Sequence, residues 1–297
     1  MKIHENIEMS KFTSFKLGGP CKRMVIIESD YELSEELKRI EGSGENMLFL
    51  GNGSNTLCKD GGFNGVVIKL GEQYNYVKKL SENLVEVGAA TLMSQVAKSV
   101  AAMGLAGFEF ASGIPGSIGG AIYMNAGAYG GEMKDIVEEV CVMERSGEIS
   151  IITAASMEFG YRTSVLQKSG AIVLWVKLRL KEGDEVLIRE EMKTLLDARN
   201  SKQPVNYPSA GSFFKRPEGD YAGRLIDAAG MRGVSVGGAQ VSEKHCGFII
   251  NTGQAKTSDV LALMKLVQNQ VESQFGVKLE PEVRIVGEDL PQGGSND

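Results

Sequence analysis

The chain has 297 residues, 42% of them hydrophobic and 24% charged, which is typical of a soluble globular protein long enough for two domains. A net charge of −6 without a long basic run argues against a nucleic-acid partner, and no apolar segment reaches the roughly 20 residues that span a membrane. The absence of a signal segment, the four scattered cysteines and the two histidines favour a cytoplasmic protein without a disulfide framework or a metal site.

The first part of the chain alternates between predicted strands and helices. Ser29 or Asp30 caps a predicted helix that ends near Gly42, because apolar residues recur at helical spacing between them. Thr91 caps a second predicted helix that ends at Gly104. Short apolar runs predict strands at 24–27, 47–50, 66–70 and 84–87.

Two glycine-rich segments are candidates for binding phosphate. The turn at 51–56 follows a predicted strand, but it lacks the third glycine and the helix of the Rossmann fingerprint. Residues 111–131 hold seven glycines in 21 positions, which permits close approach of a ligand and exposes backbone N–H groups to an anion. We therefore expect a cofactor diphosphate at 111–131. Either segment can instead be a plain loop whose glycines serve turns.

The second part of the chain continues the mixed pattern and predicts an α+β protein. Asp184 begins a predicted helix that runs to about Arg199, and Ser258 caps another that ends at Gly276. The polar segment 200–208 contains two prolines and suits a linker between domains. A short helix is expected at 221–229, and strands are expected at 136–143, 149–152, 171–180, 247–251 and 283–286.

Five motifs, taken in their order along the chain, carry a resemblance to a known family. They are GNGSNTL at 51–57, ASGIPGSIGGAIYMNAGAYGGE at 111–132, FGYRTS at 159–164, GSFFKRP at 211–217 and EPEVRIVG at 280–287. Together they resemble the UDP-N-acetylenolpyruvoylglucosamine reductase family, in its shorter subtype. The first two motifs are shared with the wider superfamily of vanillyl-alcohol-oxidase-type FAD proteins and imply FAD alone. The last three in combination are specific to the reductase.

The resemblance implies a fold and a division of the chain. An FAD-binding domain of the vanillyl-alcohol-oxidase type is expected at 1–200, with subdomains at about 1–72 and 73–200. A smaller α+β substrate domain is expected at 201–287, and residues 288–297 are expected to be a disordered tail.

The implied activity is the NADPH-dependent reduction of UDP-N-acetylglucosamine enolpyruvate to UDP-N-acetylmuramate. This reaction belongs to peptidoglycan precursor synthesis in the cytoplasm, and therefore to cell wall biogenesis, cell shape and cell division. FAD is expected to be bound without a covalent bond, although His4 could carry attached flavin as in some members of the superfamily. No separate nicotinamide motif is visible, which suits a ping-pong scheme with one shared pocket.

The resemblance also assigns three catalytic residues. Reduction of an enol ether needs a hydride at one carbon and a proton at the next, and the neighbouring carboxylate must be activated to hold charge. A guanidinium matches a carboxylate bidentately, and Arg162 takes this role with the assistance of a protonated Glu282. Ser212 is the implied proton donor.

Further residues are implied to bind ligands. Lys215, Arg224 and Arg284 could meet the UDP diphosphate, Tyr161 could line the same pocket, and His245 could contact substrate or lie on the surface. The implied FAD-binding residues are Gly51, Asn52, Gly53, Ser54, Asn55, Thr56, Leu57, Ser112, Gly113, Ile114, Pro115, Gly116, Ser117, Gly119, Gly120, Ala121, Asn125, Gly127 and Ala128.

Two other functions remain as alternatives. An alcohol or lactone oxidase of the same superfamily would share the first two motifs but has no reason to carry GSFFKRP and EPEVR. A non-catalytic nucleotide-binding protein would keep the glycine-rich segments but could lose Arg162, Ser212 or Glu282. Taken singly, each of these three residues is more often a surface or turn residue, and only their ordered combination favours catalysis.

Overall fold

The structure is a computed structural model that describes residues 1–290. The chain forms two compact units, each with its own hydrophobic core. The first unit comprises Met1–Ile3, Met24–Asn52 and Val67–Ser201, and the described part of the second comprises 4–23, 53–66 and 202–290. The strands β1 (Lys2–Glu8), β2 (Pro20–Ile27) and β5 (Phe63–Leu70) have residues in both units.

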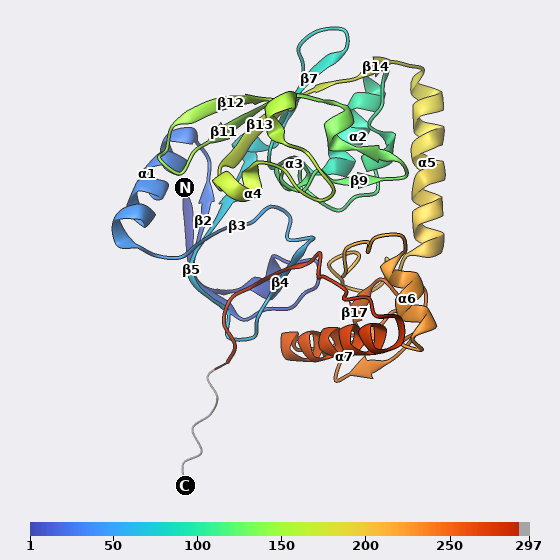
Figure 1. Cartoon of the computed structure of the whole chain (residues 1–297). Helices are drawn as coiled ribbons and strands as arrows, with labels where there is room; N and C mark the ends of the chain where they lie inside the picture. The colour runs from blue at the N-terminus through green and yellow to red at the C-terminus, as the bar shows by residue number, and fades with distance from the viewer. Residues whose placement is uncertain (291–297) are drawn as a thin grey trace. The chain divides into compact units, whose positions relative to one another are not determined.

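The first unit contains a five-stranded antiparallel sheet in the order β12-β11-β13-β7-β6 (Figure 1). Its other strands are short and include β3, which pairs with β5. The strands are β3 (Met47–Phe49), β6 (Val77–Lys79), β7 (Leu84–Gly88), β8 (Leu105–Ala106), β9 (Gly127–Ala128), β10 (Gly131–Glu132), β11 (Val137–Met143), β12 (Ile149–Thr153), β13 (Ile172–Arg179) and β14 (Lys181–Glu182). The helices are α1 (Asp30–Ser43), α2 (Met93–Ala102), α3 (Ile118–Tyr123), α4 (Leu166–Ser169) and α5 (Glu185–Lys202).

The strand predicted at 171–180 is β13, which is the central strand of this sheet. It pairs with β11 on one side and with β7 on the other, and its residues from Ile172 to Leu174 are buried. The helix α3 packs against β13 and β7 and closes the core over them. Lys177 lies at a partly exposed position and forms an ion pair with Glu139 of the neighbouring strand.

Of the two N-terminal caps predicted for helices α1 and α2 of the first unit, one is confirmed and one is wrong. Ser29 accepts a hydrogen bond from the N–H of Glu32 and caps α1, as predicted, and Gly44 ends the helix at φ 67°. The predicted cap of α2 is wrong, because α2 begins at Met93 after Leu92. The hydroxyl of Thr91 instead accepts from the N–H of Tyr76 and donates to its carbonyl, so the side chain fixes a neighbouring loop.

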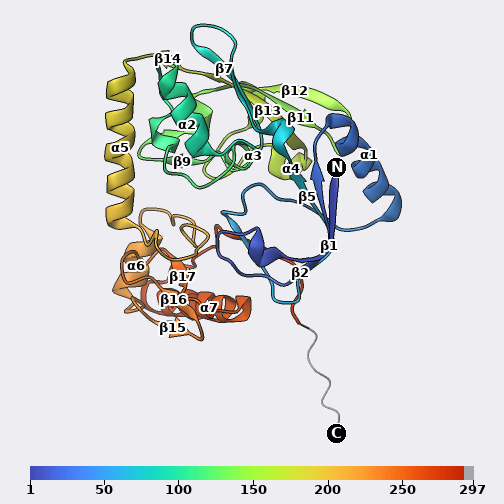
Figure 2. The same cartoon turned by 180° about the vertical axis from the view of Figure 1, so that it is seen from behind.

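The second unit packs two helices with a small sheet. The sheet has the order β15-β16-β17 and lies beside α7, as Figure 2 shows. A parallel pair, β4 and β18, joins two segments far apart in the chain. The strands are β4 (Thr56–Cys58), β15 (Ser235–Val236), β16 (Ala239–Val241), β17 (Ile249–Asn251) and β18 (Arg284–Val286). The helices are α6 (Ala222–Ala228) and α7 (Thr257–Phe275).

The N-terminus of α7 corrects another predicted cap. The helix begins at Thr257, so Ser258 lies inside its first turn and does not cap it. The carboxylate of Asp60 accepts hydrogen bonds from the N–H groups of Thr257 and Ser258, both at 2.8 Å. A carboxylate at this position satisfies free donors and complements the positive end of the helix.

Several elements have no counterpart among the predicted ones. β1 occupies a stretch for which no strand is predicted, and the short helix α3 lies inside the glycine-rich segment. In the predicted tail, the main chain of Glu288 bonds to Gly61 and Gly62, and Asp289 pairs with Lys59. The rest of that prediction, 291–297, lies outside the described residues. Short 3₁₀ helices occupy Met9–Lys11, Glu72–Tyr74, Glu109–Ala111, Met133–Asp135 and Ala154–Met157.

Candidate active site

The two glycine-rich segments meet within the first unit. The turn after β3 contacts the loop that leads into α3, because the amide of Asn52 donates to the carbonyl of Pro115 at 2.6 Å. A Cβ atom on Gly51 would lie 2.7 Å from the hydroxyl oxygen of Ser117. A side chain at position 51 would therefore displace the Ser117 hydroxyl from this close approach.

Glycine also lets α3 approach the strand β7. A Cβ atom on Gly119 would lie 3.2 Å from both the Cβ and the carbonyl oxygen of Ala89. The N–H groups of Ile118 and Gly119 donate to the carbonyls of Thr91 and Ala89. Part of the glycine-rich segment thus serves packing, and these two N–H groups are engaged by the main chain.

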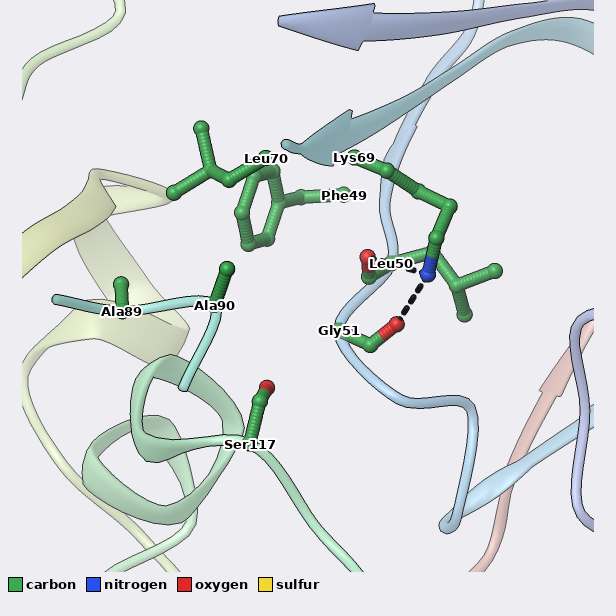
Figure 3. Close-up of a pocket in the computed structure, with 8 residues that line it drawn as sticks. All are labelled: Phe49, Leu50, Gly51, Lys69, Leu70, Ala89, Ala90 and Ser117. Carbon is green, nitrogen blue, oxygen red and sulfur yellow. Dashed lines mark hydrogen bonds between the residues drawn. The ribbon is translucent and has the colours of Figure 1, made fainter. Parts of the chain in front are cut away.

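A cavity lies where the two segments meet (Figure 3). The cavity is small and partly open to solvent, so it can hold at most one group of a dinucleotide, such as a phosphate. Its lining is Phe49, Leu50, Gly51, Lys69, Leu70, Ala89, Ala90 and Ser117. Apolar side chains suit a flat ring system, and Gly51, Lys69 and Ser117 suit phosphate or ribose oxygens.

An unsatisfied hydroxyl adjoins this region in the sequence. The Oγ of Ser112 is buried and has no hydrogen-bond partner among residues 1–290. Buried polar atoms are rarely left unpaired, so such an atom fits a ligand that supplies the partner. The close-approach glycines, the cavity and this hydroxyl together fit a flavin dinucleotide.

The other FAD-binding candidates of the glycine-rich segment differ in burial and in the elements that they contact. Gly113 lies against the side chain of Arg199, and Ala121 is buried in α3. Ile114 is partly buried against the core of the first unit. Gly127 and Ala128 form β9, which pairs with β10. Gly116 accepts a main-chain hydrogen bond from Met93, while Gly120 is in the first turn of α3.

The remaining residues of the first motif belong to the second unit. Gly53 has a φ of +65° and accepts a hydrogen bond from the N–H of Ser14. Thr56 and Leu57 lie in β4, where Leu57 is fully buried, and Ser54 is in the turn before it. The amide of Asn55 donates to the carbonyl of Glu282 at 3.1 Å.

Asn125 is a buried polar residue that ties two motifs of the first unit together. Its side-chain amide donates to the carbonyl of Gly160 at 2.9 Å and to the carboxylate of Glu132 at 3.0 Å. Its side-chain oxygen accepts from the N–H of Lys134. The side chain therefore holds the turn that contains Arg162.

Arg162 lies in that turn with an unusual backbone conformation. Its φ is +54°, in the left-handed region that L-residues rarely occupy, and such strain is common at functional sites. The guanidinium donates to the carbonyl of Gly127 at 3.2 Å and lies 5.2 Å from the ring centroid of Tyr161. Hydrogen bonds from Lys134 and Asn125, with the charge of Arg162, keep the pKa of Glu132 below its ordinary value.

The structure brings Ser212 and Glu282 onto two adjacent segments of the second unit. The N–H of Glu282 donates to the carbonyl of Phe213, and the N–H of Lys215 donates to the carbonyl of Glu280. Phe214 and Pro281 form an antiparallel bridge between these two hydrogen bonds. The two motifs are therefore held in a fixed register.

Two basic candidates of the second unit have acidic partners. Lys215 pairs with Glu280 at 3.0 Å, and Arg224 pairs with Asp220 one helical turn away. The Arg224 guanidinium lowers the pKa of Asp220 to about 2. Arg284 is exposed in β18, where its N–H donates to the carbonyl of Asn55.

His245 is half-buried next to the same segments. Its Nδ1 accepts a hydrogen bond from the N–H of Gly247, and its ring packs edge-on against Phe248 at 5.1 Å. The carbonyl of Gly247 accepts from the N–H of Phe213, which connects this loop to the residue after Ser212. Desolvation lowers the pKa of His245, so the ring is neutral at pH 7.

The thiol next to His245 is not an activated nucleophile. Burial raises the pKa of Cys246 to about 11, and the same cause raises the pKa of Cys58 to about 12. All four cysteines are buried as free thiols. These thiols are therefore protonated at neutral pH and act as small apolar side chains.

The sequence analysis did not predict a functional role for two basic residues of the first unit. Lys69 lines the cavity described above, and burial lowers its pKa to about 8. Arg199 lies beside Gly113, and desolvation lowers its pKa as well. The sequence held one signal for Lys69, which is a charged residue directly after the buried residues of an apolar strand. A charged side chain at such a position is often functional.

Residues 1–290 hold neither a cluster of metal ligands nor a membrane-spanning helix. No group of histidine, cysteine, aspartate or glutamate among residues 1–290 is arranged to hold a metal ion. No helix in the same range is long and apolar enough to cross a membrane.

Comparison with known proteins identifies the family of this chain. The FAD binding domain family matches residues 21–153, and the chain is therefore an FAD-binding oxidoreductase. The C-terminal domain family of UDP-N-acetylenolpyruvoylglucosamine reductase matches residues 203–286. The chain belongs to the UDP-N-acetylenolpyruvoylglucosamine reductase family, which confirms the predicted resemblance, the α+β class and the FAD cofactor.

The similarity covers nearly the whole chain. The reductase of Alkaliphilus oremlandii is 49% identical over 95% of this chain and 92% of its own length. The reductase of Clostridioides difficile is 47% identical over the same shares. The crystal structure of the Thermus caldophilus reductase matches with a TM-score of 0.82 and 35% identity, over 96% of this chain and 99% of that one.

Proposed function

We propose that this chain reduces UDP-N-acetylglucosamine enolpyruvate to UDP-N-acetylmuramate with NADPH as the source of electrons. The observation that carries the proposal is the fixed register between the Ser212 segment and the Glu282 segment in a member of this family. The product is a precursor of peptidoglycan, so the proposal places the chain in cell wall synthesis in the cytoplasm, with effects on cell shape and division.

Non-covalently bound FAD supplies the hydride in this proposal. The enol ether of the substrate is a poor hydride acceptor unless its carboxylate can take up negative charge. The protein must therefore place positive charge or an acidic hydrogen at the carboxylate, and a proton donor over the other carbon. Charge stabilisation of this kind is worth roughly 3–4 kcal/mol for each donor.

Arg162 is the proposed partner of the substrate carboxylate. A guanidinium stays charged and can bind both carboxylate oxygens. The strained backbone of Arg162 and the buried Asn125 that bonds to Gly160 in the same turn support this role, because such strain persists only where the surroundings determine it. Glu282 assists at the same carboxylate in its protonated form, and a nearby substrate anion would favour that form.

Ser212 is the proposed proton donor. A serine hydroxyl is a weak acid, so it must be oriented by its neighbours. The residue after it is held on both sides, since the N–H of Phe213 donates to Gly247 and its carbonyl accepts from Glu282. This fixed main chain supports a defined position for the hydroxyl.

The remaining proposals concern substrate binding and domains. Tyr161 and His245 would contact substrate, and three basic residues would meet its diphosphate: Lys215, Arg224 and Arg284. Two of these have acidic partners that the diphosphate would have to displace. We assign FAD binding to residues 1–200 and substrate binding to residues 201–287.

The experiment compares the two half-reactions in Ser212→Ala. Flavin reduction by NADPH is expected to stay within about threefold of wild type, while reoxidation by the UDP-enolpyruvyl sugar slows by about two to three orders of magnitude. Ser235→Ala, an exposed serine of the same unit, is the matched control. Equal slowing of both half-reactions would instead give Ser212 a structural role.

A further inference from the structure

The cavity between the glycine-rich segments is lined by both apolar and polar groups (Figure 3). The apolar side chains are those of Phe49, Leu50, Leu70, Ala89 and Ala90. Polar groups come from Gly51, Lys69 and Ser117, near the end of β3 and the start of α3. A ligand that suits this lining has an apolar part next to an anionic part.

Lys69 is the one charged residue in the lining of this cavity. Its ammonium donates to the carbonyl of Leu50 at 3.4 Å and to the carbonyl of Gly51. Among residues 1–290, no carboxylate lies within ion-pair distance of it. Lys69 directly follows three buried residues of β5, which are Val66, Val67 and Ile68, so its aliphatic side chain begins at the edge of the core.

The desolvated ammonium of Lys69 bonds to two carbonyls and lacks a negatively charged partner. Buried charges are normally paired, because removing a charge from water costs several kcal/mol. The two carbonyls use two of the three N–H donors of the ammonium, and the third can serve a ligand. An anion in the cavity would supply the missing negative charge.

We propose that Lys69 is the cationic residue of the subsite that holds the diphosphate of FAD, and that it also fixes the Gly51 turn in its binding conformation. The inference deepens the assignment of FAD to this chain and does not depend on which substrate is reduced. A phosphate near Gly51 and Ser117 would meet the ammonium, the serine hydroxyl and the main chain of the turn. Charge-assisted hydrogen bonds of this kind are stronger than neutral ones.

The proposal predicts a proton linkage to FAD binding. Desolvation lowers the pKa of Lys69 to about 8, so part of the protein carries a neutral amine above that pH. An anion stabilises the charged form and raises the pKa of Lys69 in the complex. Tight FAD binding is therefore fully present below pH 8 and weakens as the pH rises through about 8 to 9.

The test measures FAD affinity of the apoprotein by quenching of flavin fluorescence. Lys69→Met is expected to weaken FAD binding by about 10- to 100-fold and to remove the pH dependence between 7 and 9. Lys69→Arg keeps the charge and is expected to retain affinity within about threefold of wild type. Lys79→Met, an exposed lysine of β6 in the same unit, is the matched control and should change nothing.

Two outcomes would overturn the proposal. One is an FAD affinity of Lys69→Met within twofold of wild type, and the other is a wild-type affinity that stays constant from pH 7 to 9. The second measurement needs no variant, so it holds even if Lys69→Met fails to fold. Failure of the proposed reductase reaction would leave FAD affinity and its pH dependence in place, so the two failures are distinguishable.

Discussion

The side-chain amide of Asn55 donates a hydrogen bond to the main-chain carbonyl of Glu282, although 227 residues separate them in the chain. The carbonyl of Asn55 in turn accepts from the N–H of Arg284. Asn55 thus holds the segment of the proposed acid from both sides, and the parallel pair of β4 and β18 continues directly from it. Part of the first glycine-rich motif therefore positions the segment that carries Glu282.

Asn55→Ala tests this positioning role. The substitution removes one partly buried hydrogen bond, so the free energy of unfolding should fall by about 1 kcal/mol. Reoxidation of the flavin by the UDP-enolpyruvyl sugar should slow by about tenfold, while reduction by NADPH changes less. Urea denaturation and stopped-flow absorbance measure the two effects. Asn206→Ala, at an exposed asparagine of the same unit, should match wild type in both; equal effects of the two variants would contradict the role.

Asn125→Ala and Asn125→Gly separate a hydrogen-bonding role from backbone strain. Each variant loses the bonds to Gly160 and Glu132, so each should be destabilised by about 1–3 kcal/mol. Asn125 has a φ of +43°, which glycine adopts more readily than alanine, so the Gly variant should be the more stable by about 1 kcal/mol. Thermal unfolding gives the stabilities. Wild-type stability of both variants would show that the side-chain network contributes nothing.

The stability of the protein should depend on the protonation of His245. Burial lowers its pKa in the folded state, so the unfolded chain binds more protons as the pH falls. This contribution to stability is complete above the unfolded pKa of about 6.5 and is lost as the pH falls below it, through the lowered pKa of the folded state. Denaturant unfolding from pH 8 to 5 measures it. His245→Asn should reduce the loss, whereas a variant of the exposed His4 should keep it; an unchanged slope in His245→Asn would contradict the assignment.

The sequence predicted best where the signal was local. β13 follows from its apolar run and α1 from its cap at Ser29, because both depend on neighbours in the chain. The predicted cap of α2 was wrong because α2 begins at Met93, and the hydroxyl of Thr91 bonds to the main chain of Tyr76 instead. The cap of α7 comes from Asp60, and no pattern near the helix could reveal a partner 197 residues away.

The candidate site was predictable as a set of motifs but not as a set of contacts. Motif order identified the family, and the comparisons confirm it. The same motifs could not show that Asn55 and Asn125 direct their amides to other parts of the protein. Lys69 was missed because it belongs to no motif and gains its surroundings only when β5 packs beside β3. The catalytic assignments of Arg162, Ser212 and Glu282 stay predictions.

The central claim is tested most directly by the two half-reactions of the wild-type protein, measured anaerobically in a stopped-flow instrument. NADPH should bleach the visible absorbance of bound FAD, and UDP-N-acetylglucosamine enolpyruvate should then restore it while UDP-N-acetylmuramate forms. The proposed reaction would be contradicted if the UDP-enolpyruvyl sugar could not reoxidise the reduced flavin. Reduction of the flavin by simple alcohols, followed by reoxidation by oxygen, would favour an oxidase.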